Sequence, residues 1–255
     1  MSDGPWRTWE DFLQAGTTDV PRNRFGITGR NELERVERIH SSVRIVELEL
    51  SPLPGEFDLR HLRSIHRYIF QDVYAWAGII RPFTLFKAGD EFCRPQFIEP
   101  YAAGIFGRLH QADLLRDLDA DTFVANASAL LADVNALHAF REGNGRSQRA
   151  FLSQLAAQAG HPLVWPIGAE QRNIDASRAA LRGDNSELRS LVTDALRPGR
   201  PPAGDSDVPP SADRIAQQSF PRGITPAPPR VAPDAPVNDP RAGQARGYGG
   251  PYRSR

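Results

Sequence analysis

The sequence predicts a mainly α-helical domain that carries one short β-hairpin and is followed by a disordered segment. Three observations lead to this prediction. Apolar residues recur at helical spacing through most of residues 1–197, residues 79–95 break that pattern, and proline becomes abundant from residue 198. The 255 residues allow one domain or two small ones, and 40% hydrophobic with 24% charged residues is typical of a soluble globular protein.

The first strong helical pattern covers residues 31–50. One apolar stripe with spacings of three and four runs along it, formed by Leu33, Val36, Ile39, Val43 and Val46. Asn31 is expected to cap this helix, and Glu34 stands three residues later as the second half of a capping box.

A second helix is expected to start near Asp58 and to turn four apolar residues inward, namely Leu62, Ile65, Ile69 and Val73. The linker before it contains Pro52, Pro54 and Gly55, which break helices. Gly160 follows a later helical pattern, as a C-terminal glycine cap should. The further helices are expected at 98–118, 121–137, 146–159, 170–182 and 186–196.

In residues 79–95, two short β-favouring runs flank Ala88, Gly89 and Asp90, which suit a hairpin turn. An isolated hairpin is marginal on its own, so it is expected to lean on the helices. An exposed hairpin edge can also bind an extended peptide as an added strand. A solvated loop between helices is the alternative that these residues leave open.

Charge and cysteine content exclude several classes of protein. The formal net charge is +0, so no overall field attracts nucleic acid or an anionic membrane. The first residues carry charges where a signal peptide needs an apolar run, and no stretch approaches the roughly 18 apolar residues of a membrane span. Cys93 is the only cysteine, which excludes an intrachain disulfide and a cysteine-rich zinc site. A reducing compartment, the cytoplasm, is therefore expected.

From residue 198 onward, 58 residues hold 13 of the 22 prolines. Such a segment buries too little apolar surface to offset its chain entropy, so it is predicted to be disordered. The chain therefore divides into an N-terminal helical extension at 1–57, a second helical region at 58–197 and a Pro/Gly/Arg-rich tail at 198–255. An inert tail, a docking segment and a secretion signal all remain open for the last of these.

The stretch HAFREGNGRSQR, residues 138–149, joins two predicted helices and gathers residues that bind anions. His138 falls at the C-terminal end of one helix, and the next helix begins near Arg146. A helix N-terminus presents unpaired N–H groups and a partial positive charge, which favour phosphate. Gly143 and Gly145 are expected to supply positive φ angles and to let a ligand approach the backbone closely, so that the amides form a nest.

Three charged side chains in the same stretch support an anion site. Arg146 and Arg149 are three residues apart on the first helical turn, where they are expected to face one ligand. Positive side chains at a helix N-terminus are unfavourable unless an anion is present. Glu142 lies where a hard divalent cation can bridge a carboxylate and phosphate oxygens.

Taken one at a time, these residues have ordinary structural explanations. Gly-Asn-Gly is a common turn, His138 can be a packed helix-end residue, and the two arginines can pair with acidic neighbours. Other phosphate loops fit poorly, since a Walker A loop needs a lysine and the dinucleotide fingerprint needs a third glycine where Gln148 stands. The coincidence of all these residues at 138–149 favours a nucleotide site.

Residues 138–149 closely resemble the signature of the Fic family, His-Pro-Phe-x-[Asp/Glu]-Gly-Asn-Gly-Arg-x-x-Arg. The one departure is Ala139, which replaces a proline that would stiffen the chain. The resemblance extends from about Phe57 to Arg197 and includes the Trp-Ala-Gly turn after the second helix. It implies a Fic-type helical bundle in which 58–197 is the catalytic domain and the hairpin is the target-binding flap.

The resemblance also implies a role for each residue of the signature. His138 would be the general base that takes a proton from a target hydroxyl, a role that suits a pKa near ~6.5. Phe140 would anchor the loop, and Glu142 would hold Mg²⁺ across the α- and β-phosphates. Lys87, the only lysine among 31 basic residues, and Ala88 would border the nucleotide from the flap. The remaining phosphate contacts would come from Gly143, Asn144, Gly145, Arg146, Ser147 and Arg149, with Arg146 near the β-phosphate and Arg149 at the γ-phosphate.

Most Fic proteins transfer AMP from ATP to a Ser, Thr or Tyr hydroxyl, so the resemblance implies a protein adenylyltransferase. Relatives that resemble the Doc toxin transfer phosphate instead, and they carry a lysine where this chain has Gly145. The glycine therefore favours AMP transfer. Two further alternatives are a nucleotide-binding interaction module without catalysis and an enzyme that removes AMP from modified proteins.

Fic enzymes are commonly inhibited by a helix with a Ser/Thr-x-x-x-Glu-Gly/Asn pattern, whose glutamate pairs with the second arginine, here Arg149. Thr28 and Glu32 have that spacing, but Leu33 follows, and an ordinary helix start explains them better. Residues 24–37, RFGITGRNELERVE, instead resemble the leading segment of Fic toxins inhibited by a separate small antitoxin. Such toxins modify gyrase and topoisomerase IV, so this resemblance implies a toxin of the bacterial cytoplasm, with export to another cell left open.

Overall fold

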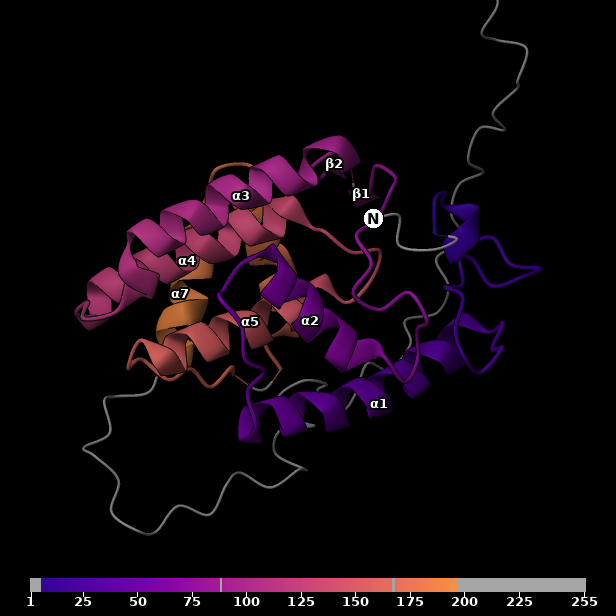
Figure 1. The fold of residues 1–255 in the computed structure, drawn as a ribbon, viewed down its shortest axis with the longest axis horizontal. Helices are drawn as coiled ribbons and strands as arrows, with labels where there is room; N and C mark the ends of the chain where they lie inside the picture. Colours follow the sequence, from indigo (N-terminus) through magenta and orange to yellow (C-terminus); the bar gives the residue numbers. More distant parts are fainter. Residues whose placement is uncertain (1–5, 88, 167, 197–255) are drawn as a thin grey trace, which may run out of the picture. The chain divides into compact units, whose positions relative to one another are not determined.

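The computed structural model describes residues 6–87, 89–166 and 168–196. Within these ranges it contains seven α-helices and one two-stranded hairpin (Figure 1). The helices are α1 (Arg30–Leu50), α2 (Leu59–Phe70), α3 (Pro95–Gln111), α4 (Ala120–Leu137), α5 (Asn144–Gln158), α6 (Glu170–Leu181) and α7 (Ser186–Ala195). The strands are β1 (Phe86–Lys87) and β2 (Asp90–Glu91). The predicted mainly helical fold with a short hairpin is confirmed.

Carboxylate caps begin two of the helices. Asp58 precedes α2, where its side chain accepts a hydrogen bond from the His61 N–H at 2.7 Å. Asp119 precedes α4 and accepts a backbone N–H of the first turn at 2.9 Å. α1 begins differently, because Gly29 occupies the N-cap position in an extended conformation and Asn31 lies inside the first turn. The predicted Asn31 cap is therefore wrong.

α2 ends at Phe70, although the apolar pattern continues beyond it. Val73 and Trp76 are both fully buried, but they lie in the turns that follow the helix. Gly78 ends these turns with φ at 82°. The buried residues of these compact turns therefore give the same apolar spacing in the sequence as two more turns of helix would.

α4 is the central helix of this fold. It packs against α3, α5, α6 and α7, while α2 packs on α5 and α1 lies beside α2 along one edge (Figure 1). Large buried side chains fill the space between the helices, among them Leu62, Phe70, Phe123 and Phe151. Since α4 and α5 are in contact, the loop at 138–143 that connects them is held between packed helices.

The N-terminal segment before α1 belongs to the same hydrophobic core. Phe12 is fully buried, and its ring centroid lies 5.4 Å from those of Trp76 and Phe83. The indole N–H of Trp76 donates to the Arg22 carbonyl at 2.9 Å. The N-terminal segment therefore stabilises the turns that follow α2.

Of the apolar stripe predicted on α1, only Leu33 belongs to the buried face of the helix. Ile39 and Val43 are 59% and 54% exposed. The buried residues of α1 are Leu33, Ser41, Ser42, Ile45 and Leu48. Ser41 lies inside because it accepts a hydrogen bond from Arg146 of α5, while Ser42 donates to the Arg38 carbonyl of its own helix. A search for apolar spacing therefore selects mainly the other side of α1.

The predicted hairpin is confirmed over the alternative of a solvated loop. β1 and β2 pair antiparallel, with Lys87 opposite Asp90. Just after β2, the Cys93 N–H donates to the Ala136 carbonyl at 3.0 Å, which ties the hairpin to α4. Ala88, at the turn, lies outside the described residues.

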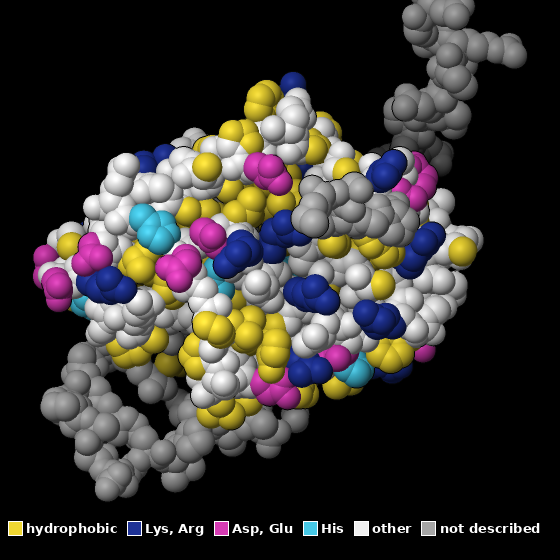
Figure 2. Space-filling model, in the orientation of Figure 1, with side chains coloured by type: hydrophobic (Ala, Val, Ile, Leu, Met, Phe, Trp, Pro, Cys, Tyr) yellow, Lys and Arg dark blue, Asp and Glu magenta, His cyan; other side chains and the backbone are white. Residues whose placement is uncertain are grey.

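In the part of the chain that the structure describes, no helix is both long and apolar enough to cross a membrane. On the face drawn in Figure 2, basic side chains lie among acidic and apolar ones, in keeping with the net charge of +0. The proline-rich tail predicted from residue 198 lies outside the described residues.

Candidate active site

His138 stands at the C-terminal end of α4 in the left-handed region, with φ at 42° and ψ at 56°. Its Nδ1 lies 3.3 Å from the Asn135 carbonyl, so Nδ1 carries the proton and donates it. Its ring stacks on Phe92, with the centroids 3.8 Å apart. Burial lowers the pKa of His138 to about 3, which keeps the imidazole neutral at physiological pH. A neutral imidazole with a protonated Nδ1 leaves the Nε2 lone pair ready to accept a proton.

A buried arginine fixes the backbone around His138. Arg81 donates from Nε to the His138 carbonyl at 2.8 Å and from Nη1 to the Phe83 carbonyl at 2.6 Å. Its Nη2 donates to the Cys93 carbonyl. Burial lowers the pKa of Arg81 to about 10, so the guanidinium remains charged at neutral pH. Arg81 thus ties both ends of the hairpin segment to the residue that carries the candidate base.

Hydrogen bonds from the polar side chains of Asn144 and Ser147 hold the loop that leads into α5. Asn144 is buried, and its amide accepts the Phe140 N–H at 3.0 Å and donates to the Phe140 carbonyl at 2.7 Å. The Ser147 hydroxyl donates to the Gly143 carbonyl at 3.1 Å. Gly143 itself has φ at 79° and is the N-cap of α5, where no side chain of the described residues caps the helix. The first N–H groups of α5 are therefore left for an external anion.

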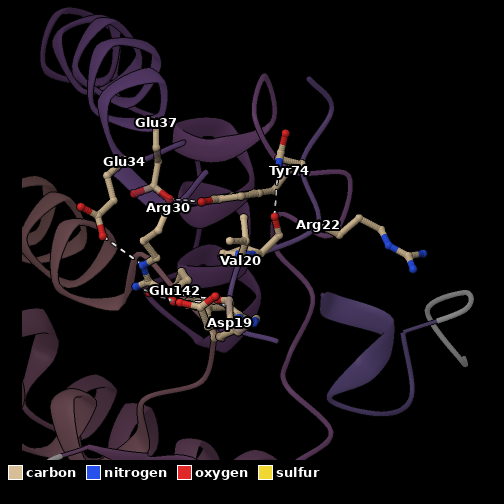
Figure 3. Close-up of polar contacts among 12 residues, drawn as sticks. Asp19, Val20, Arg22, Arg30, Glu34, Glu37, Tyr74 and Glu142 are labelled. Atoms are coloured by element: carbon tan, nitrogen blue, oxygen red, sulfur yellow. Dashed lines mark hydrogen bonds and ion pairs between the residues drawn. The ribbon is translucent and has the colours of Figure 1, made fainter. Parts of the chain in front are cut away.

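Glu142 lies beside two guanidinium groups. Its Oε1 is 2.9 Å from Nη1 of Arg141 and 3.9 Å from Nη2 of Arg30, which reaches it from α1 (Figure 3). Burial raises the pKa of Glu142. Within the described residues, no three His, Cys, Asp or Glu side chains gather as a metal cage. One carboxylate is nevertheless what Mg²⁺ needs when substrate phosphates complete its coordination, so Glu142 fits that ion.

The two arginines of the signature point in different directions. Arg146 is held by Glu37 of α1, which also accepts the Tyr74 hydroxyl (Figure 3). Arg146 Nη1 additionally donates to the Ser41 hydroxyl at 2.9 Å. Arg149 lies on the other side, with Nη1 3.5 Å from where a Cβ at Gly145 would stand.

A hollow lies between the hairpin, the start of α5 and α6. Of the predicted residues it brings together Lys87, His138 and Gly145. The other described residues predicted for the site do not line the hollow, namely Glu142, Gly143, Asn144, Arg146, Ser147 and Arg149. Its wall also includes residues that were not predicted, namely Asp90, Phe92, Asn135, Gln148, Asn173, Ile174, Ser177, Arg178 and Leu181.

The sequence of α6 contains one pattern that could have predicted its part of the lining of the hollow. Asn173, Ser177 and Leu181 are spaced by four residues and so share one helix face. On the opposite flank, the Asn135 amide donates to the Ser177 carbonyl at 3.0 Å and joins α4 to α6. The spacing alone cannot tell a ligand-facing stripe from a surface one.

The low pKa of His138 predicts a pH-dependent stability. Below about pH 6.5 the unfolded chain binds a proton at this residue while the folded chain does not, so the free energy of unfolding falls as pH falls. Between pH 7 and pH 5 the loss from this group is about 1–2 kcal/mol. Urea unfolding of the wild type and His138→Gln at both pH values measures it. An equal pH effect in both proteins would contradict the prediction.

Gly143→Ala is expected to destabilise the fold by about 2–5 kcal/mol, because alanine is strained at this φ and its Cβ overlaps a ring. That Cβ would overlap Cε2 and Cζ of the Phe70 ring. Gly160→Ala is the matched control, since φ there is 84° but nothing lies within 4 Å of the added Cβ. It should cost only about 1–2 kcal/mol in urea unfolding. Equal losses would show that Phe70 does not constrain the loop.

A model described as the Fic/DOC family matches residues 56–156. The chain is 40% identical over 185 residues to the probable protein adenylyltransferase y4lH of Sinorhizobium fredii, covering 72% of this chain and 94% of that protein. It is 31% identical over 193 residues to the probable protein adenylyltransferase Fic of Escherichia coli, covering 76% and 95%.

The chain is also similar to one longer protein and to two Fic domains of known structure. The chain is 38% identical over 175 residues to the protein adenylyltransferase VbhT of Bartonella schoenbuchensis, covering 69% of this chain but only 37% of VbhT. The crystal structure of the effector BepC of Bartonella tribocorum with bound AMPPNP has a TM-score of 0.71 at 25% identity, covering 75% of this chain and 98% of that one. A Fic domain of Bartonella quintana with bound ADP has a TM-score of 0.68 at 25% identity, covering 75% and 96%.

Proposed function

Because the chain belongs to the Fic/DOC family and is similar over most of its length to protein adenylyltransferases of that family, we propose that it transfers AMP from ATP to a hydroxyl side chain of a target protein. One observation carries the proposal. The neutral imidazole of His138 borders the same hollow as Gly145, which lies in the first turn of α5. A proton acceptor and an anion-binding helix end therefore face one space.

The hollow suits a nucleotide, in line with the AMPPNP bound to BepC. At Gly145, an added Cβ would meet only Arg149 Nη1 at 3.5 Å and the Asn173 amide at 3.9 Å. The glycine leaves this space open for phosphate oxygens, which a lysine would fill. This favours transfer of AMP over transfer of the terminal phosphate.

In the proposed reaction, Nε2 of His138 takes the proton of the target hydroxyl. The hydroxyl oxygen then forms a bond to the α-phosphorus of ATP, and the bond from that phosphorus to the bridging oxygen breaks. The products are the AMP-modified protein and pyrophosphate. N–H groups at the start of α5 offset the negative charge that develops on the phosphate oxygens.

Glu142 would hold Mg²⁺ together with the phosphates of ATP. When bound, the ion withdraws charge from the phosphate oxygens and orients them. Arg141 and Arg30 both lie beside the Glu142 carboxylate, and Figure 3 shows Arg30 next to it.

The target is proposed to bind as an added strand on the hairpin. β1 and β2 are two residues each, and Phe86 and Lys87 are exposed. Lys87 lies at the rim of the hollow, where it can contact both the target backbone and the nucleotide.

The reaction is tested with ATP labelled at either the α- or the γ-phosphate in the presence of candidate target proteins. Label from the α-phosphate is expected to appear on a target together with released pyrophosphate. Transfer of γ-label alone would replace this proposal with phosphate transfer. Binding of ATP and Mg²⁺ without transfer of either label would favour a non-catalytic module.

We further propose that the enzyme is a bacterial toxin that modifies the ATP-binding subunits of gyrase and topoisomerase IV and is inhibited by a separate antitoxin acting at Arg149. The support is the likeness of residues 24–37 to the leading segment of such toxins. Expression of the chain alone in bacteria is expected to arrest growth and to leave the gyrase subunit adenylylated. Normal growth with abundant soluble enzyme would contradict the toxin role.

A further inference from the structure

His66 of α2 is a buried histidine that the proposed reaction does not use. Its side chain is 0% exposed, and both ring nitrogens have partners. Nδ1 accepts the Gly78 N–H at 2.8 Å, and Nε2 lies 2.9 Å from the Glu142 carbonyl. The ring also stacks on Phe140, with the centroids 3.9 Å apart.

These contacts fix which nitrogen carries the proton. A backbone N–H can only donate, so Nδ1 must be the acceptor for Gly78. The single proton of the neutral ring is then on Nε2, which donates to the Glu142 carbonyl. The imidazole therefore connects the turn after α2 to the loop before α5, two segments far apart in the sequence.

The hydrogen bond to Glu142 determines the direction of the next N–H group. In a trans peptide the carbonyl of one residue and the N–H of the next point in opposite directions. With the Glu142 carbonyl turned toward His66, the Gly143 N–H must point away from α2. No acceptor for this N–H exists among the described residues.

The same peptide is otherwise free to turn over, because Gly143 is a glycine with φ at 79°. A flipped peptide would present the Glu142 carbonyl where an N–H is needed, and a carbonyl repels phosphate oxygens. We propose that His66 is a positioning residue that holds the Glu142–Gly143 peptide in the orientation that binds the phosphates of ATP. The inference rests on the proposed function for the identity of the anion.

Two substitutions of His66 each retain one of the two hydrogen bonds that the imidazole makes. In His66→Asn the side-chain carbonyl can still accept from Gly78, but it is too short to reach Glu142. In His66→Gln the amide nitrogen extends to the position of Nε2 and can still donate to the Glu142 carbonyl. Both remove the ring from Phe140, so both are expected to lower the melting temperature by similar amounts.

Binding of ATP with Mg²⁺, measured by calorimetry on the full chain, is expected to weaken at least tenfold in His66→Asn and at most threefold in His66→Gln. In transfer assays KM for ATP should follow the same order, while kcat at saturating ATP stays within threefold of wild type. Equal losses in the two variants, or a loss confined to kcat, would show that His66 is only a packing residue.

The amide resonance of Gly143 in a nitrogen-15 spectrum provides a readout that needs neither ATP nor a target. It is expected to shift in His66→Asn and to stay near its wild-type position in His66→Gln. If the wild type binds no ATP, the proposed function fails while this measurement still decides the inference. An unmoved Gly143 resonance in His66→Asn would overturn it.

Discussion

His138→Ala is expected to reduce AMP transfer by a factor of about 10²–10⁴, the usual contribution of a general base. Among the described residues that line the hollow beside Gly145, His138 is the one with an available proton-accepting nitrogen. Its low pKa keeps it unprotonated across the physiological range. Transfer of α-label to a target, with ATP saturating, measures the loss.

The phosphate contacts come from the backbone at the start of α5, so calorimetric binding of ATP to His138→Ala should stay within about threefold of wild type. His161→Ala is the matched control, because His161 also stacks on a phenylalanine, with its centroid 4.3 Å from Phe123. It lies outside the lining of the hollow. This control should transfer AMP at close to the wild-type rate. Similar losses in both variants would remove His138 from the role of base.

Residues 138–149 show what the sequence can predict about the site. The two glycines, the end of one helix and the start of the next are all local features, and the structure places them where the pattern indicates. Gly143 has the expected positive φ and His138 stands at the junction, but Gly145 lies inside the first turn of α5, and its φ is not positive as predicted. The backbone geometry of such a stretch can be predicted from the sequence because it depends mainly on neighbouring residues in the chain.

The direction of a long side chain is not local. Arg146 and Arg149 occupy adjacent turns of α5, and the spacing suggested that they face one ligand. Arg146 instead turns to α1, because Glu37 offers it a carboxylate and Phe70 lies 4.6 Å from its guanidinium carbon. The residues of 138–149 give no sign that Arg146 pairs with Glu37, which lies more than a hundred residues away in the sequence.

Dependence on distant residues also explains why the apolar stripe of α1 was wrongly predicted to be its buried face. Spacing identifies apolar residues on one side of a helix, but the buried side of α1 carries Ser41 and Glu37, which serve Arg146. Ile39 and Val43 were left outside as a result. Polar residues that solvate a buried charge look like surface residues in a sequence.

This buried pair has a large expected effect on stability. Glu37→Ala should lower the free energy of unfolding by about 3–5 kcal/mol, because it leaves a buried guanidinium without its counter-charge. The side chains of Arg146 and Glu37 are only 16% and 13% exposed. The Tyr74 hydroxyl loses its acceptor at the same time, and burial followed by the charge of Glu37 is what raises the pKa of that hydroxyl in the wild type.

Glu34→Ala is the control from the same helix. Glu34 pairs with Arg30 at 3.0 Å, but these side chains are 54% and 44% exposed, so the loss should be below about 1 kcal/mol. The double substitution Glu37→Leu with Arg146→Met tests the cause, since it removes both charges and retains volume. It should be more stable than Glu37→Ala, because an apolar pair leaves no buried charge to compensate. Urea unfolding that ranks the double variant below Glu37→Ala would show that the stability of this contact comes from the ion pair itself and not from the need to neutralise Arg146.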